Sequence, residues 1–365
     1  MALRPQPRKC CGNNEWSVDF VATLKDVAAL AGVGMSTASR AISGAGPVSP
    51  AALKKVQAAV EQLNFRPSSI GRSLSSKSLG MIGIYTPSFF GAYYGTILQQ
   101  TDIELRAIRR HVVVATGCGE GDRREETIEA VNFLIERDCD GIVVLAHDLR
   151  EEDMLVLYKK QPRIAFLNRR NPSAPETGFC PDHYRGGELA AQALIEAGHR
   201  QIAVIAGPAT AFDNIERISG FYAQLEKLGI ARSSVRQVDG DFSRDSGYGA
   251  AARLLEQGGN FTGLFCANDE MAVGALACLH QRGISVPQQV SVIGYDDDYT
   301  AEYSVPALTS VHIPMQEVTR NAVRWLLNLC YGTGHEIVRA YPISVSMRAT
   351  LAPPPGHSIT TPAAN

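Results

Sequence analysis

Amide and carboxylate side chains stand directly after three short apolar runs of this 365-residue sequence. Ligands of parallel sheets bind beyond the carboxyl ends of the strands, so groups in these positions are expected to share one cleft. An amide or a carboxylate can hold two adjacent hydroxyl groups, and a buried polar group left unmatched penalises the wrong isomer. The pattern therefore predicts a polar cleft suited to a small sugar. The residues are Asn168 after RIAFL, Asn268 and Asp269 after GLFCA, and Asp296, Asp297 and Asp298 after VSVIGY.

These side chains also have a purely structural interpretation. Asn268 and Asp269 are as well placed to cap a helix over MAVGAL as to contact a ligand. Asp297 and Asp298 suit a helix cap or a surface position better than a ligand contact. Three consecutive aspartates also make a poor metal site, because adjacent side chains at a strand end point apart and no His or Glu supports them. Neither a metal nor a cofactor is expected.

Catalytic groups are not evident in the sequence. No Ser/His/Asp set and no pair of carboxylates can be assigned, and GCGEGD at 117–122 lacks the spacing of a phosphate-binding loop. His111, His147 and His183 lie at the edges of expected elements without an evident partner. We therefore expect a binding protein and not an enzyme.

The elements that must position the polar residues alternate regularly over 81–351. Short apolar strands separated by helices predict parallel sheets covered on both faces, here arranged as two doubly wound lobes. The predicted fold is an α/β two-lobed domain preceded by an all-α module. Strands are expected at 81–85, 111–116, 141–146, 163–168, 201–207, 263–268 and 290–296. Helices are expected at 92–110, 123–137, 184–197, 213–228, 245–257 and 269–282.

The all-α module begins with TLKDVAALAGVGMSTASRAIS at Thr23. Thr23 and Asp26 have the spacing of a capping box, Gly32 interrupts the helical pattern, and a second helix is expected from Met35. Pro50, behind a serine, opens a third helix. Alanines where the first two helices cross allow close approach, so the module is predicted to be a helix-turn-helix bundle that presents its second helix to DNA. On pattern alone, a structural cap or a protein-docking module is the alternative.

Charge is distributed unevenly along the chain. Residues 1–80 hold ten Lys/Arg against four acidic residues, whereas the whole chain has a net charge of −2. A basic front on an acidic body indicates that only the front meets a polyanion. The basic, serine-rich segment FRPSSIGRSLSSKS is typical of a linker that orders on binding. The expected division is a flexible extension at 1–22, a helix-turn-helix domain at 23–67, a hinge at 68–80, a two-lobed effector-binding and dimerisation domain at 81–351, and a flexible tail at 352–365.

These motifs together resemble one known family. DVAALAGV, STASRAISG and RPSSIGRSL in the front, and IEAGHRQIAVIAGP, CANDEMAVGAL and VSVIGYDD in the body, are similar to the lactose-repressor/galactose-repressor (LacI/GalR) family of bacterial regulators. The galactose- and aryl-glucoside-type branch looks closest. The resemblance implies a sequence-specific DNA-binding transcriptional regulator of carbohydrate-metabolism genes, expected to be a repressor. Its allosteric effector would be a small sugar or sugar derivative, bound between the lobes of a periplasmic-binding-protein-like domain.

The resemblance also implies roles for individual residues. A guanidinium in the recognition helix can bind guanine in bidentate fashion, and an apolar hinge residue can wedge into the minor groove. The DNA-binding residues would be Met35, Ser36 and Arg40 at the bases, Thr37 and Ser39 near the phosphates, and Leu74 as the wedge. The effector-binding residues would be Asn168, Asp213, Arg217, Asn268 and Asp296, with Phe242 stacking on the sugar and Phe90 and Tyr94 closing the first lobe.

Three positions depart from the family pattern. Gly34 stands where a serine usually caps the recognition helix, and Ser68 and Gly71 replace an asparagine and an alanine of the hinge. Glycine in place of a capping serine costs only about a few tenths of a kcal/mol. A lower operator affinity, or a hinge that depends more on DNA to fold, is expected.

The Pro-rich tail and the lack of long apolar segments indicate the oligomeric state and the location of the protein. The Pro-rich tail lacks leucine heptads, so a homodimer on a pseudo-palindromic operator in double-stranded DNA is expected and not a tetramer. No apolar run is long enough for a membrane span and no secretory signal is evident, so a cytoplasmic protein is expected. The nearest rival is a purine- or other metabolite-responsive regulator of the same architecture. A sugar-binding protein without a regulatory role would need a signal peptide and no helix-turn-helix.

Overall fold

The computed structural model of the chain describes residues 22–44, 46–65, 78–117, 121–258 and 260–356. The chain divides into two compact units, Met1–Leu79 and Gly80–Asn365. Most of the expected extension, hinge and tail lies outside the described residues. None of the helices in the described ranges has both the length and the apolar composition needed to cross a membrane.

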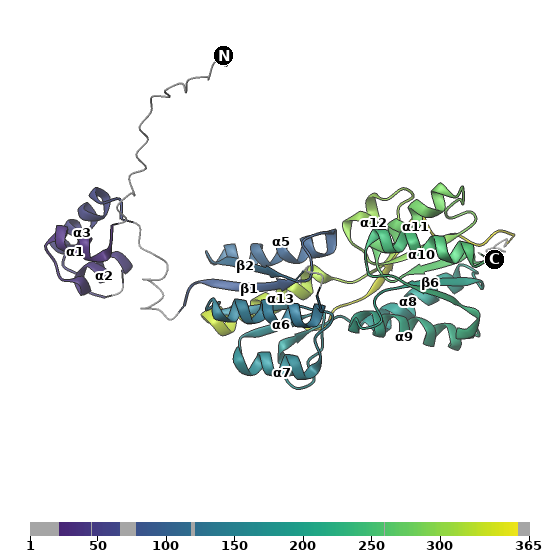
Figure 1. The fold of residues 1–365 in the computed structure, drawn as a ribbon, viewed down its shortest axis with the longest axis horizontal. Helices are drawn as coiled ribbons and strands as arrows, with labels where there is room; N and C mark the ends of the chain where they lie inside the picture. Colours follow the sequence, from purple (N-terminus) through teal and green to yellow (C-terminus); the bar gives the residue numbers. More distant parts are fainter. Residues whose placement is uncertain (1–21, 45, 66–77, 118–120, 259, 357–365) are drawn as a thin grey trace, which may run out of the picture. The chain divides into compact units, whose positions relative to one another are not determined.

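The first unit is a bundle of three helices, α1 (Leu24–Ala31), α2 (Met35–Ser43) and α3 (Pro50–Gln62) (Figure 1). Thr23 and Asp26 form the predicted capping box, in which the Thr23 amide donates to Asp26 Oδ2 over 2.8 Å. Gly32 ends α1 in the left-handed conformation (φ 64°) that glycine adopts without strain. Small side chains let the helices approach closely, and the predicted all-α module is confirmed. Its buried core comprises Val27, Ala28, Ala31, Ala38, Val56 and Ala59.

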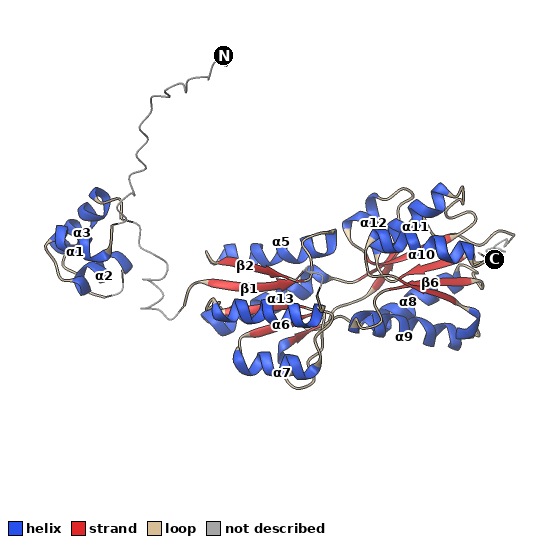
Figure 2. Ribbon diagram, in the orientation of Figure 1, coloured by secondary structure: helices blue, strands red, loops and turns tan. Residues whose placement is uncertain are grey.

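The second unit has two lobes, each built on a sheet with helices on both sides of the strands (Figure 2). The first-lobe sheet has the order β2-β1-β3-β4-β5, and every neighbouring pair is parallel. All five residues of its central strand β3 are buried, as expected for a sheet covered on both faces. The strands are β1 (Met81–Thr86), β2 (His111–Thr116), β3 (Gly141–Leu145), β4 (Ile164–Leu167) and β5 (Gly178–Phe179), and the helices between them are α5 (Ala92–Ala107), α6 (Arg123–Glu136) and α7 (Glu151–Lys160).

The second-lobe sheet has the order β11-β10-β9-β8-β6-β7. Its pairs are parallel except at one edge, where β11 runs antiparallel to β10. The two-lobed α/β fold is therefore confirmed, with this one antiparallel edge as a correction. The strands are β6 (Ile202–Ala206), β7 (Arg236–Asp239), β8 (Gly263–Cys266), β9 (Ser291–Asp296), β10 (Thr309–His312) and β11 (Ser344–Ser346), and the helices are α8 (His183–Glu196), α9 (Phe212–Lys227), α10 (Arg244–Glu256), α11 (Asp269–Gln281) and α12 (Tyr299–Tyr303).

The chain passes between the lobes three times, which sequence reasoning did not predict. It leaves the first lobe after β5, returns after β10, and leaves again after the long helix α13 (Met315–Tyr331). α13 packs on α5, β3 and β4 of the first lobe, although it follows a strand of the second. Both lobes are thus discontinuous in sequence, and a change in the angle between them must be absorbed by three neighbouring connections.

Close packing of α8 on α9 supports the position of α9. Gly187 on α8 faces the backbone of α9, where a β-carbon would overlap the Arg217 carbonyl oxygen and lie 2.7 Å from the Phe221 nitrogen. Gly220 on α9 faces the backbone of Tyr184 in the same way. These two glycines let the helices touch backbone to backbone.

Gly187→Ala is expected to destabilise the second unit. Alanine improves helix propensity by about 1 kcal/mol, but the overlap with α9 forces a backbone shift that costs about 3 kcal/mol or more. Urea unfolding of the full chain measures the difference. Gly249→Ala is the matched control, because a β-carbon on that α10 residue meets nothing within 4 Å and should leave stability unchanged or slightly raised. Equal effects of the two substitutions would contradict the packing argument.

Candidate functional site

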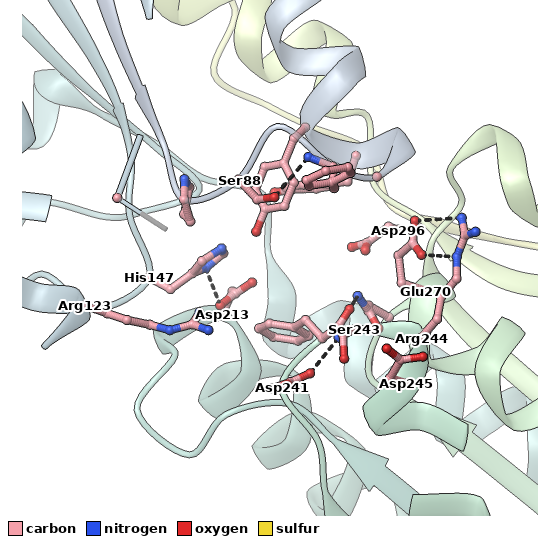
Figure 3. Close-up of a pocket in the computed structure, with 18 of the residues that line it drawn as sticks. Ser88, Arg123, His147, Asp213, Asp241, Ser243, Arg244, Asp245, Glu270 and Asp296 are labelled. Carbon is pink, nitrogen blue, oxygen red and sulfur yellow. Dashed lines mark hydrogen bonds and ion pairs between the residues drawn. The ribbon is translucent and has the colours of Figure 1, made fainter. Parts of the chain in front are cut away.

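A cavity of about 600 Å³ lies between the two lobes, at the carboxyl ends of their strands (Figure 3). The first lobe contributes the loop after β1, the first turn of α5 and the loop after β3, and the second contributes the starts of α9, α10 and α11 and the end of β9. Its volume is in the range of small-molecule sites. Seven of the eight residues predicted to bind an effector line it, namely Phe90, Tyr94, Asp213, Arg217, Phe242, Asn268 and Asp296.

Arg217 is the central cation of the cavity floor. It lies one turn into α9 and is only 2% exposed. Its Nη1 donates to the Ala267 carbonyl, while its Nη2 lies 3.4 Å from Asp213 Oδ2 and 3.8 Å from Asp296 Oδ1. The guanidinium also lies over the Tyr295 ring, 3.7 Å from its centroid. Burial opposes the charge, but Asp296 and other neighbours raise the pKa of Arg217, so the cation is retained.

Asp213 connects the two lobes. Its Oδ1 lies 3.1 Å from His147 Nδ1 and its Oδ2 accepts from Asn168 Nδ2 over 3.1 Å, and both partners belong to the first lobe. Burial alone favours the neutral acid, but His147 and Arg217 hold the pKa of Asp213 well below its ordinary range. Asp213 is therefore an ionised carboxylate that faces the cavity and also bridges the lobes.

Asp296 differs from Asp213 in its protonation preference. It ends β9 with φ 105°, a conformation that side-chain-bearing residues rarely adopt. Burial raises the pKa of Asp296 well above its ordinary value, even though Arg217 lies beside it. A protonated carboxyl can donate as well as accept a hydrogen bond, whereas an ionised one only accepts. The two carboxyl groups beside Arg217 thus differ in the direction in which their pKa values are shifted.

Asn268 serves as a helix cap and also lines the cavity. Its side chain accepts from the Met271 amide over 2.9 Å at the start of α11, and its Nδ2 donates to the Phe242 carbonyl over 3.0 Å. The two interpretations left open by the sequence are thus compatible at this residue. Asp269, by contrast, is fully buried and accepts from the Ser310 hydroxyl over 2.6 Å, so it is structural.

Asp297 and Asp298 hold the structure together outside the cavity lining. Asp297 accepts from His312 and Ser346 and forms an ion pair with Arg348, around the ends of β10 and β11. Despite burial, these donors lower the pKa of Asp297 to about 2. Asp298 caps α12 by accepting from the Thr300 amide over 2.7 Å. Both residues have the structural roles favoured by the sequence.

Asn168 is the predicted effector residue that is absent from the cavity lining. It is 2% exposed and lies behind Asp213, to which it donates. Its Oδ1 lies 2.6 Å from His183 Nε2, and His183 Nδ1 lies 3.0 Å from the Tyr295 hydroxyl. Burial, followed by the charge of Arg217, lowers the pKa of His183 to about 3, so this histidine is neutral. Asn168 thus orients the carboxylate of Asp213 from the opposite lobe.

Aromatic side chains form the less polar walls. Phe242, with φ 72°, follows β7 and places its ring 5.8 Å from the His147 ring. Tyr94 lines the first-lobe wall together with Tyr93, which the sequence reasoning missed. Within the described residues, the buried Tyr93 hydroxyl has no hydrogen-bond partner and is available to a ligand. Phe90 is 86% exposed at the rim.

The expectation that His147 and His183 lack partners was wrong. His147 directly follows the β3 segment, so the strand-end rule that selected Asn168 and Asp296 would also have selected it. Arg244 and Glu270, an ion pair at the other end of the cavity, were also missed. They lie on the first turns of α10 and α11, where acidic or basic residues are common and carry little signal.

The helix expected to read DNA presents its polar face to solvent in the first unit. Met35 is 54% exposed and Ser36 and Arg40 are exposed, whereas Ala38 is fully buried against the bundle. Thr37 and Ser39 are half-buried. Gly34 has no side chain to cap α2, and the Thr37 amide in the first turn donates to the Gly34 carbonyl over 2.9 Å. Leu74 lies outside the described residues.

Comparison with known proteins identifies the family. Residues 23–68 match the bacterial regulatory proteins of the lacI family, and residues 191–351 match a periplasmic binding protein-like domain. The HTH-type transcriptional regulator AscG of Escherichia coli K12 is 35% identical over 315 residues, which is 85% of this chain and 92% of AscG. The HTH-type transcriptional repressor PurR of Vibrio atlanticus is 33% identical over 318 residues, 87% of this chain and 94% of PurR. The chain belongs to the LacI family and is a DNA-binding transcriptional regulator.

Solved structures agree with this assignment. A LacI-family regulator from Burkhoderia phymatum is 62% identical, with a TM-score of 0.74 over 75% of this chain and 99% of that one. The Lac repressor dimer bound to operator and the anti-inducer ONPF is 27% identical, with a TM-score of 0.78 over 91% and 99% of the two chains. The regulator CelR in complex with cellobiose is 30% identical, with a TM-score of 0.64 over 90% and 99%.

Proposed function

We propose that this regulator is a homodimeric repressor of carbohydrate-metabolism genes, whose effector is a small sugar or sugar derivative bound in the cavity between the lobes. The observation that carries the proposal is the cavity floor, where Arg217 Nη2 lies 3.4 Å from Asp213 Oδ2 and 3.8 Å from Asp296 Oδ1. A polyol presents adjacent hydroxyl groups that both donate and accept, and this set of groups can match them.

A purine effector is the main alternative, because PurR is among the similar proteins. A flat base carries its donors and acceptors in one plane along its edges, and its faces stack on aromatic side chains. The cavity does have aromatic walls, but Phe242 stands beside a floor of one cation and two carboxyl groups. A sugar presents hydroxyl groups in several directions, which suits polar groups that come from both α9 and the end of β9. The cellobiose-bound CelR structure adds weight to the sugar.

The proposed mechanism couples the cavity to DNA through the arrangement of the lobes. Two copies of the helix-turn-helix would occupy successive major grooves of a pseudo-palindromic operator, which the operator-bound Lac repressor dimer supports by similarity. A ligand that prefers the lobe arrangement with separated linkers must weaken DNA binding, and DNA must weaken the ligand by the same factor. Such a protein works in the cytoplasm, where its operator is.

Selection of DNA fragments from a random library with the purified full-length protein tests this proposal. We expect recovery of a pseudo-palindromic site, and release of that site by a sugar in a panel of galactose, glucose, cellobiose and aryl-glucosides. Hypoxanthine and guanine form the second arm of the panel. The proposal is supported if a sugar lowers the affinity for the operator 10-fold or more. This factor corresponds to a coupling free energy of about 1.4 kcal/mol between the two sites. A response to the purines alone would assign the cavity to the rival class.

A further inference from the structure

His147 joins the two lobes through a single carboxylate. It follows β3 of the first lobe, and its Nδ1 lies 3.1 Å from Oδ1 of Asp213, at the start of α9 in the second lobe (Figure 3). Asn168, also from the first lobe, donates to the other carboxylate oxygen over 3.1 Å. Both oxygens of Asp213 are thus held by the opposite lobe.

The surroundings of His147 make its charge important. The side chain is 13% exposed, so its ion pair is screened little by solvent. The titratable or charged groups around it are Asp213 and Arg217 on α9, Asp148 in its own loop, His183 at the start of α8, and Arg123 of α6, which lines the same cavity (Figure 3). His183 is neutral, because burial and Arg217 lower its pKa to about 3. Asp213 is the nearest of these groups, and its attraction favours a proton on His147.

We propose that His147, in its imidazolium form, clasps the two lobes together through Asp213, so that the ligand-free cavity loosens as the pH rises. Neither the identity of the effector nor that of the operator enters this inference, which goes beyond the proposed function. A neutral imidazole still donates one hydrogen bond to Asp213 but loses the charge–charge attraction. The clasp weakens on deprotonation and does not disappear.

The direction of the pH effect follows from the two partners. Burial lowers the pKa of His147, but the attraction of Asp213 outweighs it and leaves the pKa above the ordinary value of 6.5. A histidine with a raised pKa contributes full stability below its unfolded pKa and loses it as the pH rises through the folded pKa. Asp213 has a pKa held well below its ordinary 3.8, so it stays ionised through this range. The clasp is therefore at full strength near pH 6, and its charge–charge part is lost above the raised pKa of His147.

Other contacts between the lobes do not share this dependence. Arg170 of the first lobe pairs with Glu216 of α9, and the Arg169 guanidinium lies 4.5 Å from the centroid of the Phe212 ring. Arginine stays charged over the whole range. Burial raises the pKa of Glu216 from 4.5, but a glutamate that gains its charge strengthens its pair with Arg170 as the pH rises, opposite to the effect of His147. Among these three contacts between described residues, only that of the histidine weakens as the pH rises.

Hydrogen exchange of the full-length, ligand-free protein tests the clasp. Mass spectrometry would follow peptides from 141–149 and 207–217 at pH 6 and pH 8, with rates corrected for the intrinsic pH dependence of exchange. We expect protection of both peptides to fall between pH 6 and pH 8, because the charge–charge part of the contact between His147 and Asp213 is lost. In His147→Gln, which keeps a donor and lacks the charge, protection should be low at both pH values.

A matched control and a second measurement keep the test decisive. His280→Gln removes an exposed histidine at the end of α11 and should retain the wild-type pH dependence. The His147 ring resonance, assigned as the signal missing from His147→Gln, should titrate above 6.5 in the wild-type protein. The inference is overturned if the wild type shows no loss of protection, if His147→Gln keeps the same pH dependence, or if the ring titrates at or below 6.5.

Discussion

Replacing Arg217 by leucine is expected to abolish the response to effector and to lower the free energy of unfolding of the second unit by about 3–5 kcal/mol. The side chain is fully buried, and it pairs with Asp213 and Asp296 and with the Ala267 carbonyl. Removing it takes the cation away from two buried carboxyl groups and leaves a ligand without its central donor.

The pH dependence of that variant provides a second check. The pKa of Asp296 is already raised by burial, and loss of Arg217 raises it further. For an acid with a raised folded pKa, the folded state binds more protons than the unfolded state, so stability falls as the pH rises between the two pKa values. Arg217→Leu should therefore be more destabilised at pH 8 than at pH 5, as measured by urea unfolding. An equal cost at both values would show that Asp296 is not the group left uncompensated.

Arg244→Leu is the control for Arg217→Leu. Arg244 lines the same cavity and pairs with Glu270, but its side chain is 53% exposed. Exposed pairs of this kind contribute about 0–1 kcal/mol, so a small change in stability is expected. Arg217→Lys retains the charge without the planar fork and should recover part of the stability but not the effector response. A full effector response in Arg217→Leu would remove this residue from the binding site.

The position of the cavity was predictable, because the rule that ligands bind at the carboxyl ends of parallel strands needs only a short stretch of sequence. A polar residue at the end of a buried parallel strand can be identified from a window of about six residues, and this rule found Asn268 and Asp296. The resemblance added Asp213 and Arg217, which lie on a helix and carry no such signal. Partners were not predictable, because Asp213 and His147 are 66 residues apart in the sequence and meet only when two lobes pack.

Helix α13 shows the same limit at the level of the fold. Its sequence MQEVTRNAVRWLLNLCY has Val318, Ala322, Leu326 and Leu327 at helical spacing, so a helix could have been predicted there. The packing of α13 on the first lobe could not have been predicted, because the strand before it, β10, belongs to the second lobe. β5 and β7 could not be predicted for a different reason. β5 has only two residues, and β7 has the largely exposed sequence RQVD, so neither shows an alternation of apolar residues. Each forms as a strand by pairing with its neighbour in the sheet, β4 or β6.

The second large effect is expected in the first unit, where Arg40→Ala should remove much of the preference for the operator over other DNA. Arg40 is exposed on α2, and Met35 and Ser36 accompany it on the solvent side. A bidentate contact between a guanidinium and guanine contributes about 1–3 kcal/mol of discrimination, or roughly 5- to 150-fold for each half-site. Competition binding with the selected operator and a scrambled duplex at fixed salt measures the ratio.

Arg40→Lys separates base reading from charge. Lysine keeps the positive charge near the phosphates but cannot make the bidentate contact, so we expect it to lose discrimination while its non-specific binding and salt dependence stay close to wild type. Arg40→Ala should lose discrimination and also bind all DNA more weakly at low salt. Sugar binding should be unchanged in both variants, because the cavity residues lie in Gly80–Asn365 and Arg40 lies in Met1–Leu79. Full operator preference in both variants would assign base reading to other residues of α2, of which Ser36 is the next to replace.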